Sequence, residues 1–149
     1  MYNLNTTDGN IWNTGNARYL HSCNDESGNK INIGVRIKLN ARGNIIESAF
    51  LDTGCRYVVI SKGICENYDI AVCEDYPIRM STRLGDFSGF INRFPIYFIA
   101  DNGDSLEVES TCFISEDWPG PIMIGWLGCL ERMKFAIDPS CNLFLFAGI

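Results

Sequence analysis

A single acidic tripeptide between two apolar runs sets the strongest condition on the fold of this chain. Asp52-Thr53-Gly54 follows the apolar residues 49–51 and precedes the apolar residues 58–60. Neither run alternates apolar with polar residues, so we expect both to be strands buried on both faces, with the tripeptide lying deep between them. A buried carboxylate is costly unless hydrogen bonds or a shared proton compensate its charge, which makes Asp52 a candidate functional residue.

The tripeptide also has an ordinary structural interpretation. Asp caps turns through its side chain and Gly accepts positive φ, so the same residues suit a plain turn. From average composition, an Asp-Thr/Ser-Gly triplet occurs by chance in roughly one chain in fifteen of this length. The triplet alone is therefore weak evidence for a catalytic acid.

Two segments together resemble the retropepsin-like aspartic proteases. The first is the apolar stretch around Asp52-Thr53-Gly54, which ends in Ile60-Ser61 as that family's active-site strand does. The second is Pro121-Ile122-Met123-Ile124-Gly125, followed by residues 126–130 and by Phe135-Ala136-Ile137-Asp138. It is similar to the family's apolar-apolar-Gly sequence, short helix and closing strand. The two segments stand in the family's order.

The resemblance implies a mostly β fold: one retropepsin-like closed β-barrel domain with one short C-terminal helix, at about residues 126–133, assembled as a homodimer. It also implies an aspartic endopeptidase, in which two carboxyl groups share a proton and activate a water molecule. The chain has one Asp-Thr-Gly, and Asp138 lacks the following glycine that would let backbone amides approach its carboxylate. A protease would therefore need a symmetric dimer that supplies Asp52 twice.

The resemblance also assigns site residues. Cys55 takes the place of the family's usual Ala or Ser, and a hairpin about 30 residues after the acid matches the flap that closes over substrate. A polypeptide substrate would lie extended between the acids and this hairpin. The expected catalytic residues are Asp52, Thr53 and Gly54, and the expected substrate-binding residues are Cys55, Leu84, Gly85, Asp86, Phe87 and Ile124.

Two positions depart from the family's pattern. Trp126 stands where viral members carry an arginine, and Arg56 stands where they carry an aspartate. The ion pair that those enzymes form beside the active site cannot be built here in the same way.

Alternation predicts further strands. Residues 30–40 alternate well, a turn at 41–44 returns the chain toward Asp52, and strands are expected at 76–80, 93–100 and 105–115. Ser61 is expected to cap a short helix or turn, and the polar tip of the flap hairpin is expected between Gly85 and Gly89.

The C-terminal end has an unusual pattern. Residues 142–149 are apolar on both alternating faces although they end the chain. An exposed strand of this kind invites aggregation unless something covers it. We expect a partner subunit to do so.

Composition limits the other function classes. A formal charge of -6 argues against a nucleic-acid-binding surface, because such binding depends on clustered Lys and Arg. No apolar run of about 18 residues and no signal peptide are visible, so we expect a cytoplasmic protein without a membrane segment. The seven cysteines form no Cys-x-x-Cys and have one histidine to join them, so neither a metal site nor another cofactor is expected.

The chain is expected to divide into a loose polar arm and one domain. Residues 1–29 are rich in Asn, Thr, Gly, Asp and Ser, so they form the expected arm, with one short strand near residues 17–21. Residues 30–149 form the expected protease domain.

Two other functions remain open. A retropepsin-like fold without turnover would serve as a dimerisation or peptide-binding module. A thiol enzyme that uses Cys55 would need His21, the one histidine, as its base. Because His21 lies in the weakly patterned arm, a plain surface role is expected for it.

Overall fold

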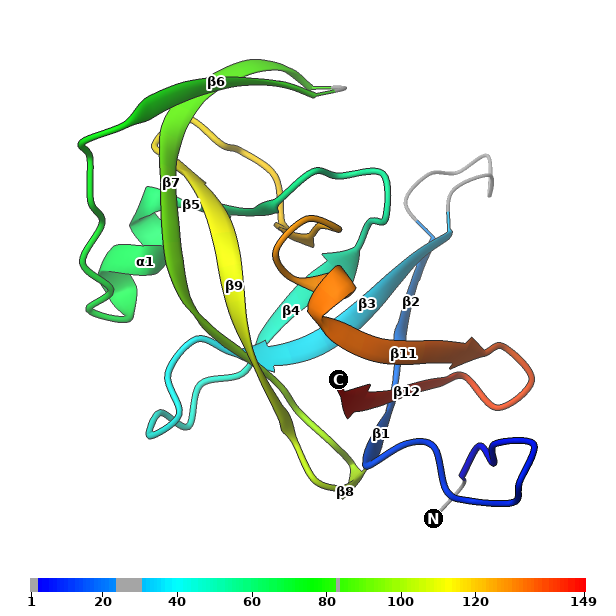
Figure 1. Cartoon of the computed structure of the whole chain (residues 1–149). Coiled ribbons are helices and arrows are strands. Elements are labelled where there is room, and N and C mark those ends of the chain that lie inside the picture. The colour runs from blue at the N-terminus through cyan, green and yellow to red at the C-terminus, as the bar shows by residue number, and fades with distance from the viewer. Residues whose placement is uncertain (1–2, 24–30, 83) are drawn as a thin grey trace.

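The structure, a computed structural model, describes residues 3–23, 31–82 and 84–149. These residues form strands in two sheets, together with one α-helix and one 3-10 helix (Figure 1). The helices are α1 (Lys62–Asn67) and η1 (Leu130–Arg132). The strands are β1 (Gly15–Arg18), β2 (Leu20–Cys23), β3 (Ile31–Lys38), β4 (Glu47–Leu51), β5 (Val58–Ser61), β6 (Pro77–Thr82), β7 (Gly85–Phe98), β8 (Asn102–Gly103), β9 (Leu106–Ser115), β10 (Ile122–Ile124), β11 (Met133–Asp138) and β12 (Leu143–Gly148).

The larger sheet has the strand order β2-β3-β4-β10-β5-β9-β7-β6. β3 also pairs with β7, through Ile37 opposite Phe98, so the sheet bends round on itself. The alternation predicted for residues 30–40 is confirmed where side chains are described, because Val35, Ile37 and Leu39 are buried. The predicted hairpin is confirmed too, since β3 and β4 are antiparallel neighbours.

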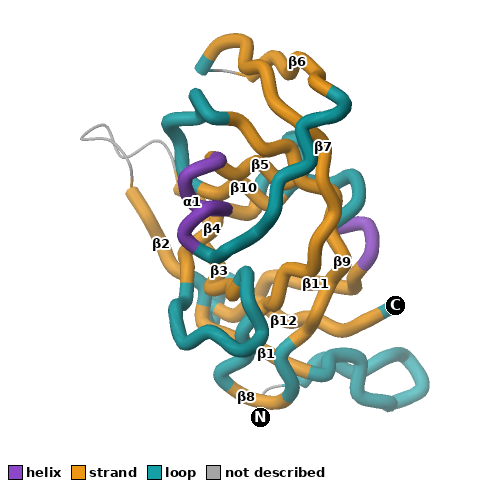
Figure 2. Tube along the Cα trace, turned by 90° about the vertical axis from the view of Figure 1, so that its left-hand side faces the viewer, coloured by secondary structure: helices purple, strands orange, loops and turns teal. Residues whose placement is uncertain are grey.

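The smaller sheet, β11-β12-β1-β8, lies at the end of the molecule away from the β6–β7 hairpin (Figures 1 and 2). Aromatic side chains join it to the larger sheet. The ring centroid of Phe98 in β7 lies 6.1 Å from that of Phe144 and 6.4 Å from that of Phe146, both in β12. All three rings are buried, so the main hydrophobic core sits between the two sheets.

The expectation that a partner subunit covers the C-terminal strand is wrong for this structure. β12 lies between β11 and β1 of its own chain, with Phe146 opposite Phe135 on one side and opposite Gly15 on the other. Residues 144–147 are all buried. Because both edges of β12 are paired and these apolar side chains are buried within the chain, the strand needs no second molecule to cover it.

Part of the expected N-terminal arm is built into both sheets. β1 pairs with β12 and β8, and β2 pairs with β3. Ala17 and Tyr19 belong to the main core, and Asn13 and Asn16 are buried as well. Residues 13–19 are therefore not loose, because their apolar side chains are buried despite the polar composition around them. The expected boundary between residues 29 and 30 lies outside the described residues.

The short helix expected at residues 126–133 is reduced to one turn of 3-10 helix. Residues 126–129 make a turn, and η1 is a single turn of 3-10 helix before β11 begins. Gly128 has a φ of +78°, which a right-handed helix does not contain. The α-helix that forms is α1, where the Ser61 side chain accepts a hydrogen bond from the Ile64 N–H at 3.4 Å, as predicted. Neither described helix has the length and apolar character needed to cross a membrane.

The short strand β10 is threaded between β4 and β5. It runs parallel to β4 and antiparallel to β5. Gly125 ends the strand and passes so close to the neighbouring loop that a Cβ there would lie 2.1 Å from the Tyr57 carbonyl oxygen. Only glycine fits at this crossing.

We therefore expect Gly125→Ala to lower the free energy of unfolding by about 1–3 kcal/mol, because the added methyl group forces backbone apart. Urea unfolding followed by circular dichroism measures this change. Gly63→Ala in α1 is the matched control, since a Cβ there meets nothing within 4 Å. It should leave stability unchanged or raise it by up to about 1 kcal/mol. Equal stability of Gly125→Ala and wild type would contradict the close crossing.

Asp101 ties the β1 segment to the larger sheet. It accepts a hydrogen bond from the Arg18 N–H at 2.7 Å and forms an ion pair with Arg36 of β3. Burial raises the pKa of Asp101, but the Arg18 amide and the Arg36 guanidinium together outweigh burial and hold that pKa below its ordinary value. The bonds therefore stabilise the fold when the carboxyl is ionised, and this stability is lost as pH falls through the lowered pKa.

Asp101→Asn should lower the free energy of unfolding at neutral pH by less than about 1 kcal/mol, because the ion pair is partly exposed. The difference from wild type should shrink as pH falls through the lowered pKa of Asp101, because below it both the folded and the unfolded carboxyls are protonated. Urea unfolding of both proteins at neutral and acidic pH measures how this stability difference depends on pH. A difference that grows toward acidic pH would refute this prediction.

Candidate active site

The tripeptide Asp52-Thr53-Gly54 begins the loop between β4 and β5. The Asp52 N–H donates to the Ile124 carbonyl oxygen at 3.0 Å, which fixes the start of the loop to β10. The Gly54 N–H donates to Asp52 Oδ1 at 2.9 Å, and the Cys55 N–H donates to the Asp52 carbonyl oxygen at 3.0 Å. The turn that carries the carboxylate therefore also orients it.

Gly54 lies directly against this carboxylate. A Cβ at residue 54 would lie 3.3 Å from Asp52 Oδ1, closer than an ordinary contact. A larger residue would therefore crowd the carboxylate and weaken its bond to the amide. This geometry is a physical reason for glycine in the third place of the tripeptide.

The rest of the loop is bonded to the turn that follows β10. The Trp126 N–H donates to the Cys55 carbonyl oxygen at 2.9 Å, and the Leu127 N–H donates to the Arg56 carbonyl oxygen at 2.7 Å. We call residues 52–57 the Asp52 loop and residues 126–129 the Trp126 turn. Backbone hydrogen bonds fasten the two together.

The tripeptide is less deeply placed than predicted. Residues 58–60 are fully buried, but Asp52 is only half-buried, and Thr53 and Gly54 are exposed. The Asp52 loop projects past the ends of β4 and β5, so the burial of these strands does not extend to it. In the single chain the candidate acid is partly accessible.

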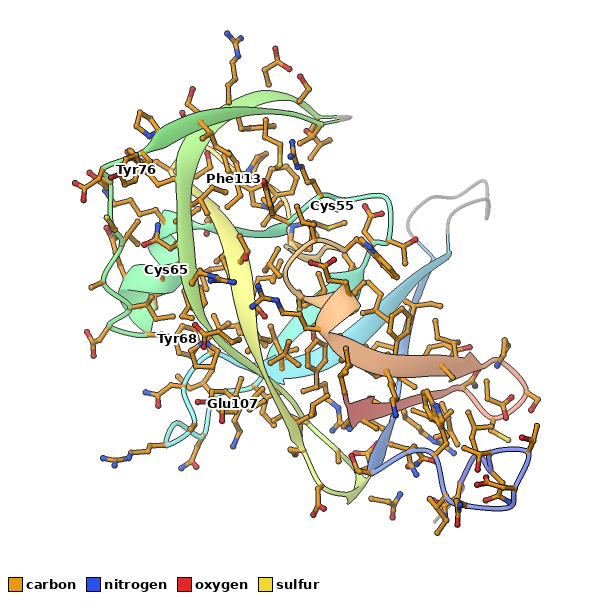
Figure 3. All side chains as sticks on the ribbon, viewed as in Figure 1. Cys55, Cys65, Tyr68, Tyr76, Glu107 and Phe113 are labelled. Atoms are coloured by element: carbon orange, nitrogen blue, oxygen red, sulfur yellow. The ribbon has the colours of Figure 1, made fainter. Side chains whose placement is uncertain are left out.

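A second, smaller hydrophobic cluster connects the Asp52 loop to the β6–β7 hairpin. We call it the hairpin cluster; its buried members are Val59, Phe113 and Trp118, and packed against them are Cys55, Tyr57, Ile78, Met80, Phe87, Ile91 and Met123. Figure 3 shows Cys55 and Phe113 beneath the hairpin, with Cys65 apart from them on α1. The rings of Phe87 and Trp118 meet edge-on, with centroids 5.2 Å apart. The cluster holds the hairpin to the part of the molecule that carries the candidate acid.

Two predicted substrate-binding residues, Cys55 and Phe87, come together in the hairpin cluster. Three others are exposed: Leu84 at the hairpin tip, and Gly85 and Asp86 at the start of β7. They contact their own hairpin: Asp86, for example, accepts a hydrogen bond from Ser81 Oγ at 2.6 Å. The structure thus separates the predicted set into a packed group and an exposed group.

The hairpin tip lies earlier in the chain than predicted. β7 begins at Gly85, so residues 85–89 are strand rather than tip. Gly85 has a φ of +121° and permits the reversal, and the Thr82 hydroxyl accepts a hydrogen bond from the Leu84 N–H at 3.1 Å. Arg83 lies outside the described residues.

The expected contact between Ile124 and substrate is not supported by the position of this side chain. Ile124 is fully buried in the main core. Successive strand residues face opposite ways, so its neighbour Met123 belongs to the hairpin cluster instead. Met123 is the residue that the sequence reasoning missed, and alternation within the apolar run 122–124 is the signal that identifies it.

The surroundings of Cys55 do not favour a reactive thiolate. Burial raises the pKa of the Cys55 thiol, and the neighbouring Asp52 carboxylate raises it further. The thiol donates a hydrogen bond to the Tyr57 carbonyl oxygen at 3.2 Å. A nucleophilic cysteine needs a nearby base or positive charge that lowers its pKa. His21 lies in β2, but its side chain is outside the described part of the structure.

Asp138 is engaged elsewhere. Its Oδ1 accepts hydrogen bonds from the Ser140 N–H at 2.9 Å and from Ser140 Oγ at 2.5 Å, in the turn between β11 and β12. This carboxylate caps a turn. Among the described side chains, no group of three or more His, Cys, Asp or Glu is placed to hold a metal ion.

Comparison with solved structures found two that are similar to this chain. A retropepsin-like aspartic protease from Rickettsia conorii matches with a TM-score of 0.54 and 16% sequence identity, over 88% of this chain and 99% of that one. The retroviral protease-like domain of Ddi1 from Leishmania major matches with a TM-score of 0.48 and 17% identity, over 76% of this chain and 91% of that one. No family model and no curated protein sequence matches the chain. The likeness to the Rickettsia structure concerns the fold alone, and on that ground this chain has a retropepsin-like fold.

Proposed function

We propose that this protein is an aspartic endopeptidase whose two catalytic carboxyl groups are the Asp52 side chains of two identical subunits. One observation carries the proposal: the acid of the single Asp-Thr-Gly is held by the Gly54 amide at the end of β4, within a retropepsin-like fold. The accessible part of Asp52 is compatible with both a substrate and a second subunit.

The proposed reaction divides acid and base work between the two copies of Asp52. One ionised carboxylate takes a proton from water while the water oxygen bonds to the carbonyl carbon of the peptide. The other, protonated carboxyl gives its proton to the carbonyl oxygen. When the tetrahedral intermediate collapses, the C–N bond breaks and the amine takes the proton that the first carboxyl gained from water. The second carboxylate recovers a proton from a hydroxyl group of the intermediate. This chemistry needs two carboxyl groups and water, without a cofactor.

Other residues would support these steps. The exposure of Thr53 and Gly54 in the single chain fits a face that meets its copy across a twofold axis, where Thr53 would brace the two loops. An extended polypeptide would pair with strand edges under the hairpin, against Cys55, Phe87 and Met123. The pairing of β3 with β7 supports the closed barrel expected for such a domain.

Asp52→Asn should abolish peptide cleavage, with a loss of at least about 100-fold, because the amide cannot exchange the proton that the reaction needs. Mass spectrometry of products from a peptide library, between mildly acidic and neutral pH, measures this. Asp138→Asn is the control, since that acid caps a turn, and it should cleave like wild type. Cleavage that persists in Asp52→Asn would rule out the dyad. A folded, dimeric wild type that cuts nothing would favour the peptide-binding module.

The cysteines provide an independent test of the thiol alternative. Because its pKa is raised, Cys55 carries little thiolate near neutral pH and should react slowly with iodoacetamide. Peptide mapping over time should show exposed Cys73 and Cys141 modified first and Cys55 later. The buried Cys65, Cys112 and Cys129 should react only after denaturation. Fastest modification at Cys55 would instead support a thiol enzyme.

A further inference from the structure

We infer that Trp126 and Leu127 form the apolar centre of the contact between the two subunits. The inference rests on the proposed function, because a dyad of Asp52 side chains requires a second copy of this chain to face the Asp52 loop. It identifies which surface that copy meets. The surface combines the exposed part of the Asp52 loop with the Trp126 turn.

Symmetry restricts where the contact can lie. Two carboxyl groups that share one proton are roughly 3 Å apart, so the twofold axis passes beside each Asp52. Residues bonded to the Asp52 loop are then near the axis. Trp126 and Leu127 meet this condition, because their N–H groups donate to the carbonyl oxygens of Cys55 and Arg56 at 2.9 and 2.7 Å.

These two residues present apolar surface on a turn that is already fixed. The residues Trp126 and Leu127 are 46% and 39% exposed. The Gly128 N–H donates to Glu131 Oε1 at 2.7 Å, and the Glu131 N–H donates to the Trp126 carbonyl oxygen at 3.1 Å. A large side chain on such a turn loses little freedom on binding, and tryptophan is enriched among the residues that dominate interface energies.

Charge favours the same surface. Each chain carries a formal charge of -6, so two copies repel each other unless they meet through a neutral patch. Thr53, Trp126 and Leu127 are uncharged, and the Arg56 guanidinium lies over the ring of its own Tyr57, 5.2 Å from the centroid. A contact centred on these uncharged residues brings the two Asp52 carboxyls together at the axis. The shared proton removes one of those two charges.

Two other apolar surfaces, β12 and the pair Ile45 and Ile46, satisfy fewer of these conditions. β12 is already paired on both sides within the chain. Ile45 and Ile46 also form an exposed pair, at 61% and 45%, but they precede β4 whereas Asp52 follows it. The length of that strand, about 17 Å, separates them from the acid and hence from the axis. Ile45 therefore serves as a matched control position.

Sedimentation velocity across a range of protein concentrations tests the inference on wild type, Trp126→Ser and Ile45→Ser. We expect Trp126→Ser to raise the dimer dissociation constant at least about 10-fold, as loss of a central interface residue does. Ile45→Ser should match wild type within about twofold. Cleavage by Trp126→Ser should return as its concentration rises, whereas Asp52→Asn should stay inactive at every concentration.

Trp126→Ser that dimerises like wild type would overturn the inference, and so would a wild type that stays monomeric at all concentrations. Circular dichroism establishes that each variant is folded; if Trp126→Ser is not, Leu127→Ser takes its place in the same measurement. Failure of the proposed function looks different. A wild type that dimerises through Trp126 but cleaves no peptide would refute the protease and leave the subunit contact standing.

Discussion

Strand β10 organises this molecule, because its three residues are threaded between β4 and β5 and serve both hydrophobic clusters. Ile122 and Ile124 enter the main core, while Met123 turns to the hairpin cluster. The carbonyl oxygen of Ile124 anchors the amide of Asp52, and Gly125 allows the chain to leave past the Asp52 loop. The acid is thereby placed at the border of the two clusters, where its backbone is fixed and its side chain is only half-buried.

The parts of the fold that were predictable are those that local pattern determines. Alternation in β3 and the continuous apolar run of β5 indicated strands because burial of one or both faces is written into neighbouring residues. The pairing of β1 with β12 was not predictable in this way, since Gly15 and Phe146 meet from opposite ends of the chain. The turn at Gly128 was missed because an apolar run next to a glycine is compatible with a short helix as well as with a turn. The positive φ of Gly128 shows that the chain turns here.

The candidate site was predictable in kind and less so in position. The sequence identifies Asp52, Thr53 and Gly54, and the bond from Gly54 to Asp52 gives the third residue a physical role. The burial of Asp52 was overestimated because the burial of a strand does not extend to the loop beyond its end. Ile124 was predicted to contact substrate, but its neighbour Met123 is the residue that faces the hairpin cluster. An error of one residue along a strand exchanges its two faces.

Because β12 is covered by strands of its own chain, folding and dimerisation are separate equilibria. A terminal strand that needed a neighbouring molecule would make folding and association a single step, and an isolated chain would then be unstable. Here β12 is paired on both sides within the chain, so under the proposed function a single copy would be folded but inactive. For the proposed dyad, activity would require dimerisation. The fraction of chains in the active dimer would then follow the concentration of the protein in the cell.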